Sequence, residues 1–102
     1  MININANLTT DEGFEVTSAW AFIDIYLLAD NWANVRYYKS KDAYQAGMNP
    51  LNVNSLPSRV STDLTNESFW GSTLATDIHN SVIAKIEEVT GEGTCSIDNT
   101  SL

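Results

Sequence analysis

Cysteine, proline and basic residues are scarce in this chain of 102 residues. The one cysteine, Cys95, has no second cysteine for an internal disulfide, which fits a reducing compartment. The sequence has no run of about 18 apolar residues, so we expect no membrane-spanning helix. Hydrophobic residues still make up 43% of the chain, and we therefore expect one folded domain with a modest core.

Positive charge is also in short supply. Five Lys and Arg stand against thirteen Asp and Glu, and the net charge of −8 disfavours nonspecific binding to nucleic acid or to an anionic membrane. Four basic residues fall between positions 36 and 59 with a single acid, Asp42, which gives that segment a balance of +3. If the segment forms one face, the molecule is polarised and can stack on copies of itself or dock on an acidic neighbour. The alternative is a few solvated lysines around a loop.

Residue types that build catalytic and metal sites are sparse. His79 and Cys95 stand in no pattern that would supply a nucleophile, a base and an orienting group. Asp24 lies in an apolar run, where it can be a tuned carboxylate, a backbone cap, the partner of Arg36 or Arg59, or a residue at a bulge. The His, Cys and carboxylate residues do not stand at metal-ligand spacing. We therefore expect no enzymatic activity, no catalytic residue, no metal and no cofactor.

The most apolar and aromatic stretch of the sequence is FEVTSAWAFIDIYLLAD, residues 14–30. We expect this stretch, including Phe14, to form the middle of the core. Its β-branched and aromatic residues favour a central strand, although a buried helix also fits a run that is apolar all round. The run is long for one strand, so we expect a bulge or bend near Ser18. Both faces are apolar from Ala19 to Leu28, which is typical of a strand covered on both sides.

Several shorter segments also have the pattern of strands. Residues 1–8 alternate between apolar side chains and Asn, which predicts a half-buried strand. The polar turn over residues 9–13, with Gly13 free to take positive φ, joins this strand to the central run as a hairpin. Further strands are expected over residues 32–39, 51–53 and 59–64.

Two helical segments are predicted. Ser40 can cap a short helical turn over residues 41–46, with Gly47 after its end. A longer helix is expected from about residue 66 to residue 90, followed by Gly91, or from Ser72 if Gly71 delays its start. The expected apolar stripe of this longer helix consists of Leu74, Ala75, Ile78, Val82, Ile86 and Val89.

These segments predict an α+β fold, in which a small antiparallel sheet of four to five strands carries one long C-terminal helix on a face. Residues 1–90 form the expected single domain, and residues 91–102 form a polar C-terminal tail that is frayed or tied down by a partner. The helix covers one face of the central strand. The short helical turn, the loops or another subunit must cover the second face, and this need is the structural argument for a homo-oligomer.

Two segments resemble small structural proteins of tailed bacteriophages. They are VRYYKSKDAYQAGMNPLNV, residues 35–53, and FWGSTLATDIH, residues 69–79. The resemblance implies a virion component, such as a connector, a tail protein or a capsid-associated protein present in many copies. It implies location in the virion, and in the host cytoplasm during assembly, with other virion proteins as partners. No site residue carries over from the resemblance.

We therefore expect a non-catalytic structural protein that assembles through aromatic anchors and charge complementarity. The residues expected at the contacts are Arg36, Tyr38, Lys39, Lys41, Tyr44 and Arg59. An acidic inhibitor or DNA mimic is one alternative, and it predicts carboxylates clustered on one face. A small carbohydrate- or peptide-binding module is another, and it needs two aromatic side chains along an exposed groove.

Overall fold

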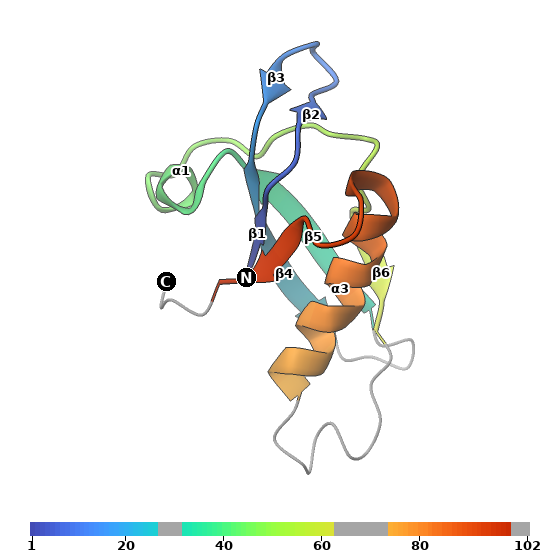
Figure 1. Ribbon diagram of the computed structural model, residues 1–102. Coiled ribbons are helices and arrows are strands. Elements are labelled where there is room, and N and C mark those ends of the chain that lie inside the picture. The colour runs from blue at the N-terminus through green and yellow to red at the C-terminus, as the bar shows by residue number, and fades with distance from the viewer. Residues whose placement is uncertain (27–31, 63–73, 99–102) are drawn as a thin grey trace.

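The computed structural model describes residues 1–26, 32–62 and 74–98 (Figure 1). Strands β6, β5, β4, β1 and β7 lie side by side in that order in one antiparallel sheet. Helix α3 packs on one face of this sheet, which confirms the predicted α+β fold. The end of the expected central strand after residue 26, residues 63–64 of the expected last strand and residues 66–73 of the expected helix lie outside the described residues.

The N-terminal part of the chain forms a long hairpin with an interruption in each arm. β1 (Ile2–Ile4) pairs with β4 (Ala19–Tyr26), and β2 (Leu8–Thr9) pairs with β3 (Glu15–Val16). The gap between β3 and β4 is the bend expected near Ser18. Gly13 occupies the hairpin turn at φ 91°, a conformation that L side chains rarely adopt.

The expected central strand is therefore two separate strands, β3 and β4. As a result, the predicted position of Phe14 is wrong. The sequence suggested that Phe14 belongs to the core, but its side chain is 70% exposed. The reason is that the chain after β1 leaves the main sheet, so residues 8–16 form a separate two-stranded extension. The extension projects beyond α3 and the sheet in Figure 1, so neither α3 nor the main sheet covers its tip.

β5 (Trp32–Tyr38) is an inner strand of the sheet. It pairs with β4 on one side and with β6 (Arg59–Ser61) on the other. The strand expected over residues 51–53 is reduced to one bridge, between Leu51 and Tyr37. The Tyr37 hydroxyl holds the same loop because it donates a hydrogen bond to the Pro57 carbonyl oxygen.

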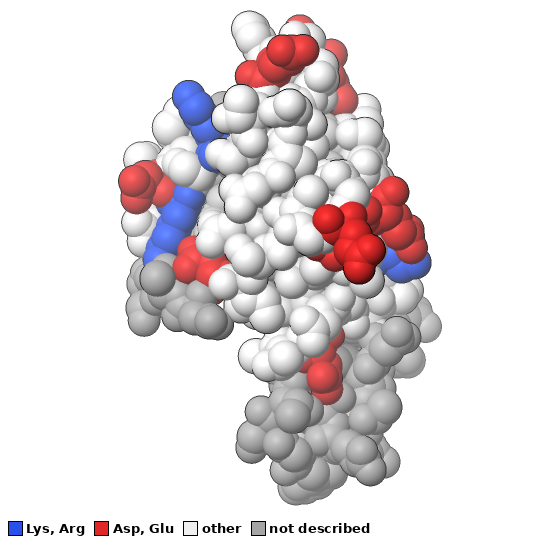
Figure 2. Space-filling model, in the orientation of Figure 1, with Lys and Arg blue, Asp and Glu red and all other residues white. Residues whose placement is uncertain are grey.

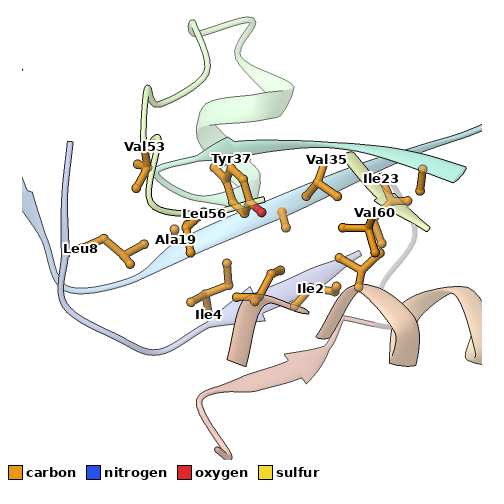
Figure 3. Close-up of a cluster of buried hydrophobic side chains, with 14 of the residues drawn as sticks. Ile2, Ile4, Leu8, Ala19, Ile23, Val35, Tyr37, Val53, Leu56 and Val60 are labelled. Carbon is orange, nitrogen blue, oxygen red and sulfur yellow. The ribbon is translucent and has the colours of Figure 1, made fainter. Parts of the chain in front are cut away.

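α3 (Leu74–Thr90) supplies one layer of the core. Ile78, Val82 and Ile86 repeat every four residues and are fully buried against the sheet. Burial of side chains of this size contributes roughly 1.5–3 kcal/mol each. The sheet and the loop beside it contribute the other side of the cluster, shown in Figure 3: Ile2, Ile4, Leu8, Ala19, Ile23, Val35, Tyr37, Val53, Leu56 and Val60.

The apolar stripe of α3 is shorter than predicted. Ala75 and Val89, expected on the stripe, are exposed. Both lie on the same face of the helix as the buried residues Ile78, Val82 and Ile86 but at the two ends of α3, outside the stretch that packs on the core. Gly91, at φ 102°, follows the helix as predicted.

The predicted boundary between the domain and the tail is also corrected. β7 (Cys95–Ile97) lies inside the expected tail, yet it pairs with β1 as an edge strand of the sheet. Glu87 of α3 fixes the turn before β7, since its Oε2 accepts the N–H groups of Gly93 at 3.0 Å and Cys95 at 3.2 Å. The segment is short and polar and carries no strand signal of its own, so the open edge of β1 determines its conformation.

Replacement of Tyr37 by Phe should destabilise the protein by about 1–2 kcal/mol, because the Pro57 carbonyl loses its buried donor. Urea unfolding at neutral pH measures this change. Tyr44→Phe is the matched control, since the Tyr44 ring is half-buried and held by ring contacts. Equal stabilities for the two variants would show that the hydroxyl bond does not hold the loop.

Candidate interaction surface

The face of the sheet opposite α3 is the candidate interaction surface, and we call it the outer face. It carries the side chains that alternate with the core positions, namely Trp20, Phe22 and Asp24 on β4 and Trp32, Asn34, Arg36 and Tyr38 on β5. α1 (Lys41–Gln45) covers one end of this face. The Ser40 hydroxyl caps α1 by accepting the Ala43 N–H at 3.1 Å, and Gly47 follows it at φ 76°, as predicted.

Four aromatic rings form a cluster beneath α1. Tyr44 projects from α1 and lies with its centroid 4.7 Å from Phe22, 5.1 Å from Tyr38 and 5.3 Å from Trp20. Trp20 is 2% exposed and Tyr38 is 4% exposed, so both act as core residues. The Trp20 indole N–H donates to Asp98 Oδ2 at 2.9 Å, which joins the cluster to the segment after β7. The short helix thus covers one end of the second face of the central strand.

Beyond the cluster, arginine side chains lie on aromatic rings. Arg36 is exposed, with its guanidinium carbon 4.9 Å from the Phe22 centroid and Nη2 2.9 Å from Asp24 Oδ2. Arg59 is exposed as well, and its guanidinium carbon lies 3.9 Å from the centroid of Trp32. Such stacking adds cation–π attraction and leaves the N–H donors of the guanidinium accessible at its edge.

Two lysines lie at the rim of the outer face. Lys39 follows β5 and is exposed, while Lys41 begins α1 and is half-buried. Both line one open groove with Asn3, Ser96 and the buried Trp20. The groove therefore presents positive charge and several hydrogen-bond donors beside the aromatic cluster.

The structure brings the six predicted contact residues to one side of the sheet. Arg36 and Arg59 lie exposed on the outer face, and Lys39 and Lys41 lie at its rim. Tyr44 is half-buried on α1, whereas Tyr38 is buried and supports the surface from below. Sequence reasoning did not find Trp32 as the platform for Arg59, because this contact depends on the register of β5 and β6.

Charge is distributed unequally around the molecule. Figure 2 looks onto α3, and it shows basic and acidic side chains together beside α1, and mainly acidic side chains over α3 and at the β2–β3 end. On α3, Lys85 is paired with Glu88, with Nζ 3.6 Å from Oε1. Among the described residues, the acids of α3 lie away from the basic residues of the segment 36–59, whereas Asp24 pairs with Arg36 and Asp42 lies on α1 beside Lys41.

The candidate catalytic residues occupy structural positions. Asp24 pairs with Arg36, one of its predicted structural roles. The Nδ1 of His79 lies 2.6 Å from the Ala75 carbonyl oxygen and its Nε2 lies 2.8 Å from the Met1 amine nitrogen, so both ring nitrogens have neighbours. Burial raises the pKa of the Cys95 thiol, which disfavours the reactive thiolate at neutral pH. In the described part of the chain, no three His, Cys, Asp or Glu residues gather in a way that could hold a metal ion.

Comparison with protein-family models, curated proteins and solved structures found no match to this chain. Among the described residues, no helix combines the length and apolar character needed to span a membrane.

The environment of His79 predicts a pH dependence of stability. Burial is the main cause that lowers the pKa of His79 below its ordinary value of 6.5. The unfolded chain therefore binds a proton at a higher pH than the folded chain, and stability should fall as the pH drops below about 6.5. Urea unfolding between neutral pH and about pH 5.5 measures this loss, because most carboxylates stay ionised there. The His79→Gln variant should show a shallower decline, and an equal decline would place its cause elsewhere.

Proposed function

We propose that this protein is a non-catalytic assembly protein that acts through contacts between several copies of itself. The observation that carries the proposal is the outer face. Of the described elements, α1 alone covers a part of it, and the face presents Arg36 and Arg59 on aromatic rings. Arginine and aromatic side chains are enriched in protein interfaces and in their energetic hot spots.

Charge complementarity supports another copy as the occupant. The exposed basic residues Arg59 and Lys39 lie on the outer face and its rim, and acidic groups are exposed on other elements of the same chain. A basic surface on one copy and an acidic surface on the next attract each other, and this attraction offsets part of the repulsion expected from a net charge of −8.

The virion part of the proposal rests on the resemblance of residues 35–53 and 69–79 to structural proteins of tailed bacteriophages. In this form the protein is a connector, tail or capsid-associated component, located in the virion and surrounded by other virion proteins. The first of the two segments includes β5 from Val35 onward and all of α1, which are the elements that build the proposed contact surface.

Two alternatives have less support from the described residues. An acidic inhibitor or DNA mimic requires carboxylates on one face, but they lie on the β2–β3 hairpin, on β4, on α1 and along α3. A carbohydrate-binding module requires free aromatic rings along a groove. Phe22, the candidate on β4, is already stacked by Tyr44 and contacted by Arg36.

Reversal of charge at Lys39 should weaken self-association at least about tenfold, which corresponds to about 1.4 kcal/mol. The physical reason is that an acid at this rim position repels an acidic surface of the next copy. Light scattering over a concentration series at two salt strengths measures the effect, and higher salt should weaken assembly of the unmodified protein. The double variant Lys39→Glu/Lys41→Glu should weaken association further.

Lys85→Glu is the matched control, because it makes the same change of charge on α3, away from the outer face. It should leave association unchanged. Equal loss in Lys39→Glu and Lys85→Glu would contradict a contact at this surface. A wild-type protein that stays monomeric at every concentration would contradict self-assembly altogether.

A further inference from the structure

The tip of the β2–β3 hairpin carries an aromatic side chain that the fold does not use. Phe14 is 70% exposed, more than the other exposed large hydrophobic residues of the described chain, Met48 at 57% and Val89 at 50%. The hairpin extends past the sheet in Figure 1, so Phe14 lies on a projection rather than on a flat surface. An exposed aromatic ring on a projection is the geometry of an interface anchor.

The hairpin tip is also held firmly in place. The Asp11 N–H donates to the Asn52 carbonyl oxygen at 2.7 Å, and Asp11 Oδ1 accepts the Asn54 N–H at 3.0 Å. The Asn52 amide donates to Glu12 Oε1 at 2.8 Å, and the Phe14 N–H donates to Thr10 Oγ1 at 3.1 Å. Because these bonds fix the turn before any partner arrives, docking costs little additional conformational entropy.

Phe14 borders an open groove that contains an acid and a base. The groove is lined by Phe14, Glu15 and Val16 on the hairpin side and by Lys39 and Ser40 on the side of β5 and α1. Glu15 and Lys39 are both exposed, and neither takes part in an ion pair within the described part of the chain. We call this surface the Phe14–Lys39 groove.

An apolar side chain, an acid and a base in one groove make that groove complementary to a copy of itself. In a two-fold interface the same patch of both subunits meets, and residue i of one contacts residue j of the other in both directions. Rotation of a second copy about such an axis sets each Glu15 against the opposite Lys39 and packs the two Phe14 rings and Val16 side chains together.

We propose that the Phe14–Lys39 groove is the site where two copies of this chain dock around a two-fold axis, with Glu15 of each copy paired to Lys39 of the other. This inference rests on the proposed self-assembly and identifies the acidic partner of Lys39. Glu87 and Glu88 of α3 are weaker candidates for that role. Glu87 already accepts two backbone N–H groups, and Glu88 is already paired with Lys85.

A charge-swap mixture tests the pairing directly. Glu15→Lys alone sets two bases against each other across the axis, and Lys39→Glu alone sets two acids against each other, so each variant alone should associate at least about tenfold more weakly. In an equimolar mixture, the doubly basic groove of the Glu15→Lys variant meets the doubly acidic groove of the Lys39→Glu variant, and both contacts are attractive again. Analytical ultracentrifugation should therefore show that the mixture regains the association of the unmodified protein.

A pair of apolar substitutions tests the anchor. Phe14→Ser should weaken association at least about tenfold, whereas Val89→Ser, which removes an exposed apolar side chain at the end of α3, should not change it. Both side chains are substantially exposed, so circular dichroism and thermal unfolding should show a fold like that of the unmodified protein in each variant.

The outcomes separate this inference from the proposed function. Restored association in the mixture, together with a loss specific to Phe14→Ser, supports the two-fold contact. If Lys39→Glu weakens association but Glu15→Lys and Phe14→Ser do not, the groove contact is overturned and Lys39 has another acidic partner. If the unmodified protein does not associate, both the groove contact and the proposed assembly are overturned.

Discussion

The packing of a single helix on a two-faced sheet is the constraint on which the rest of this structure depends. Ile78, Val82 and Ile86 of α3 bury one face of β4, which offers the small side chains of Ala19 and Ala21 at that side. In the described chain no second helix of similar length is available for the other face. That face must therefore be covered by short elements, by its own large side chains or by another molecule.

The outer face uses the first two of these solutions only in part. α1 brings one ring, Tyr44, over Trp20 and Phe22, and the aromatic cluster buries itself without forming a second core. Further along the sheet, Arg36 and Arg59 cover the apolar faces of Phe22 and Trp32 while their charged groups reach water. In the free chain the charged groups of this surface stay in water, and the surface still contains aromatic area that a partner can bury.

Local sequence signals predicted the elements whose conformation depends on a few neighbouring residues. The Ser40 cap, the positive φ of Gly47 and the bend near Ser18 all follow from short-range chemistry. The failures were long-range. Phe14 was assigned to the core because its own segment is apolar, yet its exposure depends on where the hairpin leaves the sheet.

In the candidate surface, too, the local features were predictable from the sequence and the long-range contacts were not. The cluster of basic residues between positions 36 and 59 is visible in the sequence, and strand alternation places Arg36 opposite the core. The contacts that give this surface its form join residues far apart in the chain, such as Arg59 with Trp32 and Trp20 with Asp98. Periodicity carries no information about such pairs, because they are set by the order and register of strands.

The Glu87 carboxylate at the edge of the sheet bears on how copies of this chain can meet. In the register of β7 with β1, the N–H of Cys95 points away from β1, toward the position that an added strand would occupy. Glu87 already accepts this N–H, and its negative charge repels the carbonyl oxygens of an incoming backbone. With only three residues in β7, this edge is a poor template for open-ended growth of the sheet. The self-association that we propose therefore has to use side-chain surfaces, whose sequence would determine the partner and the number of copies.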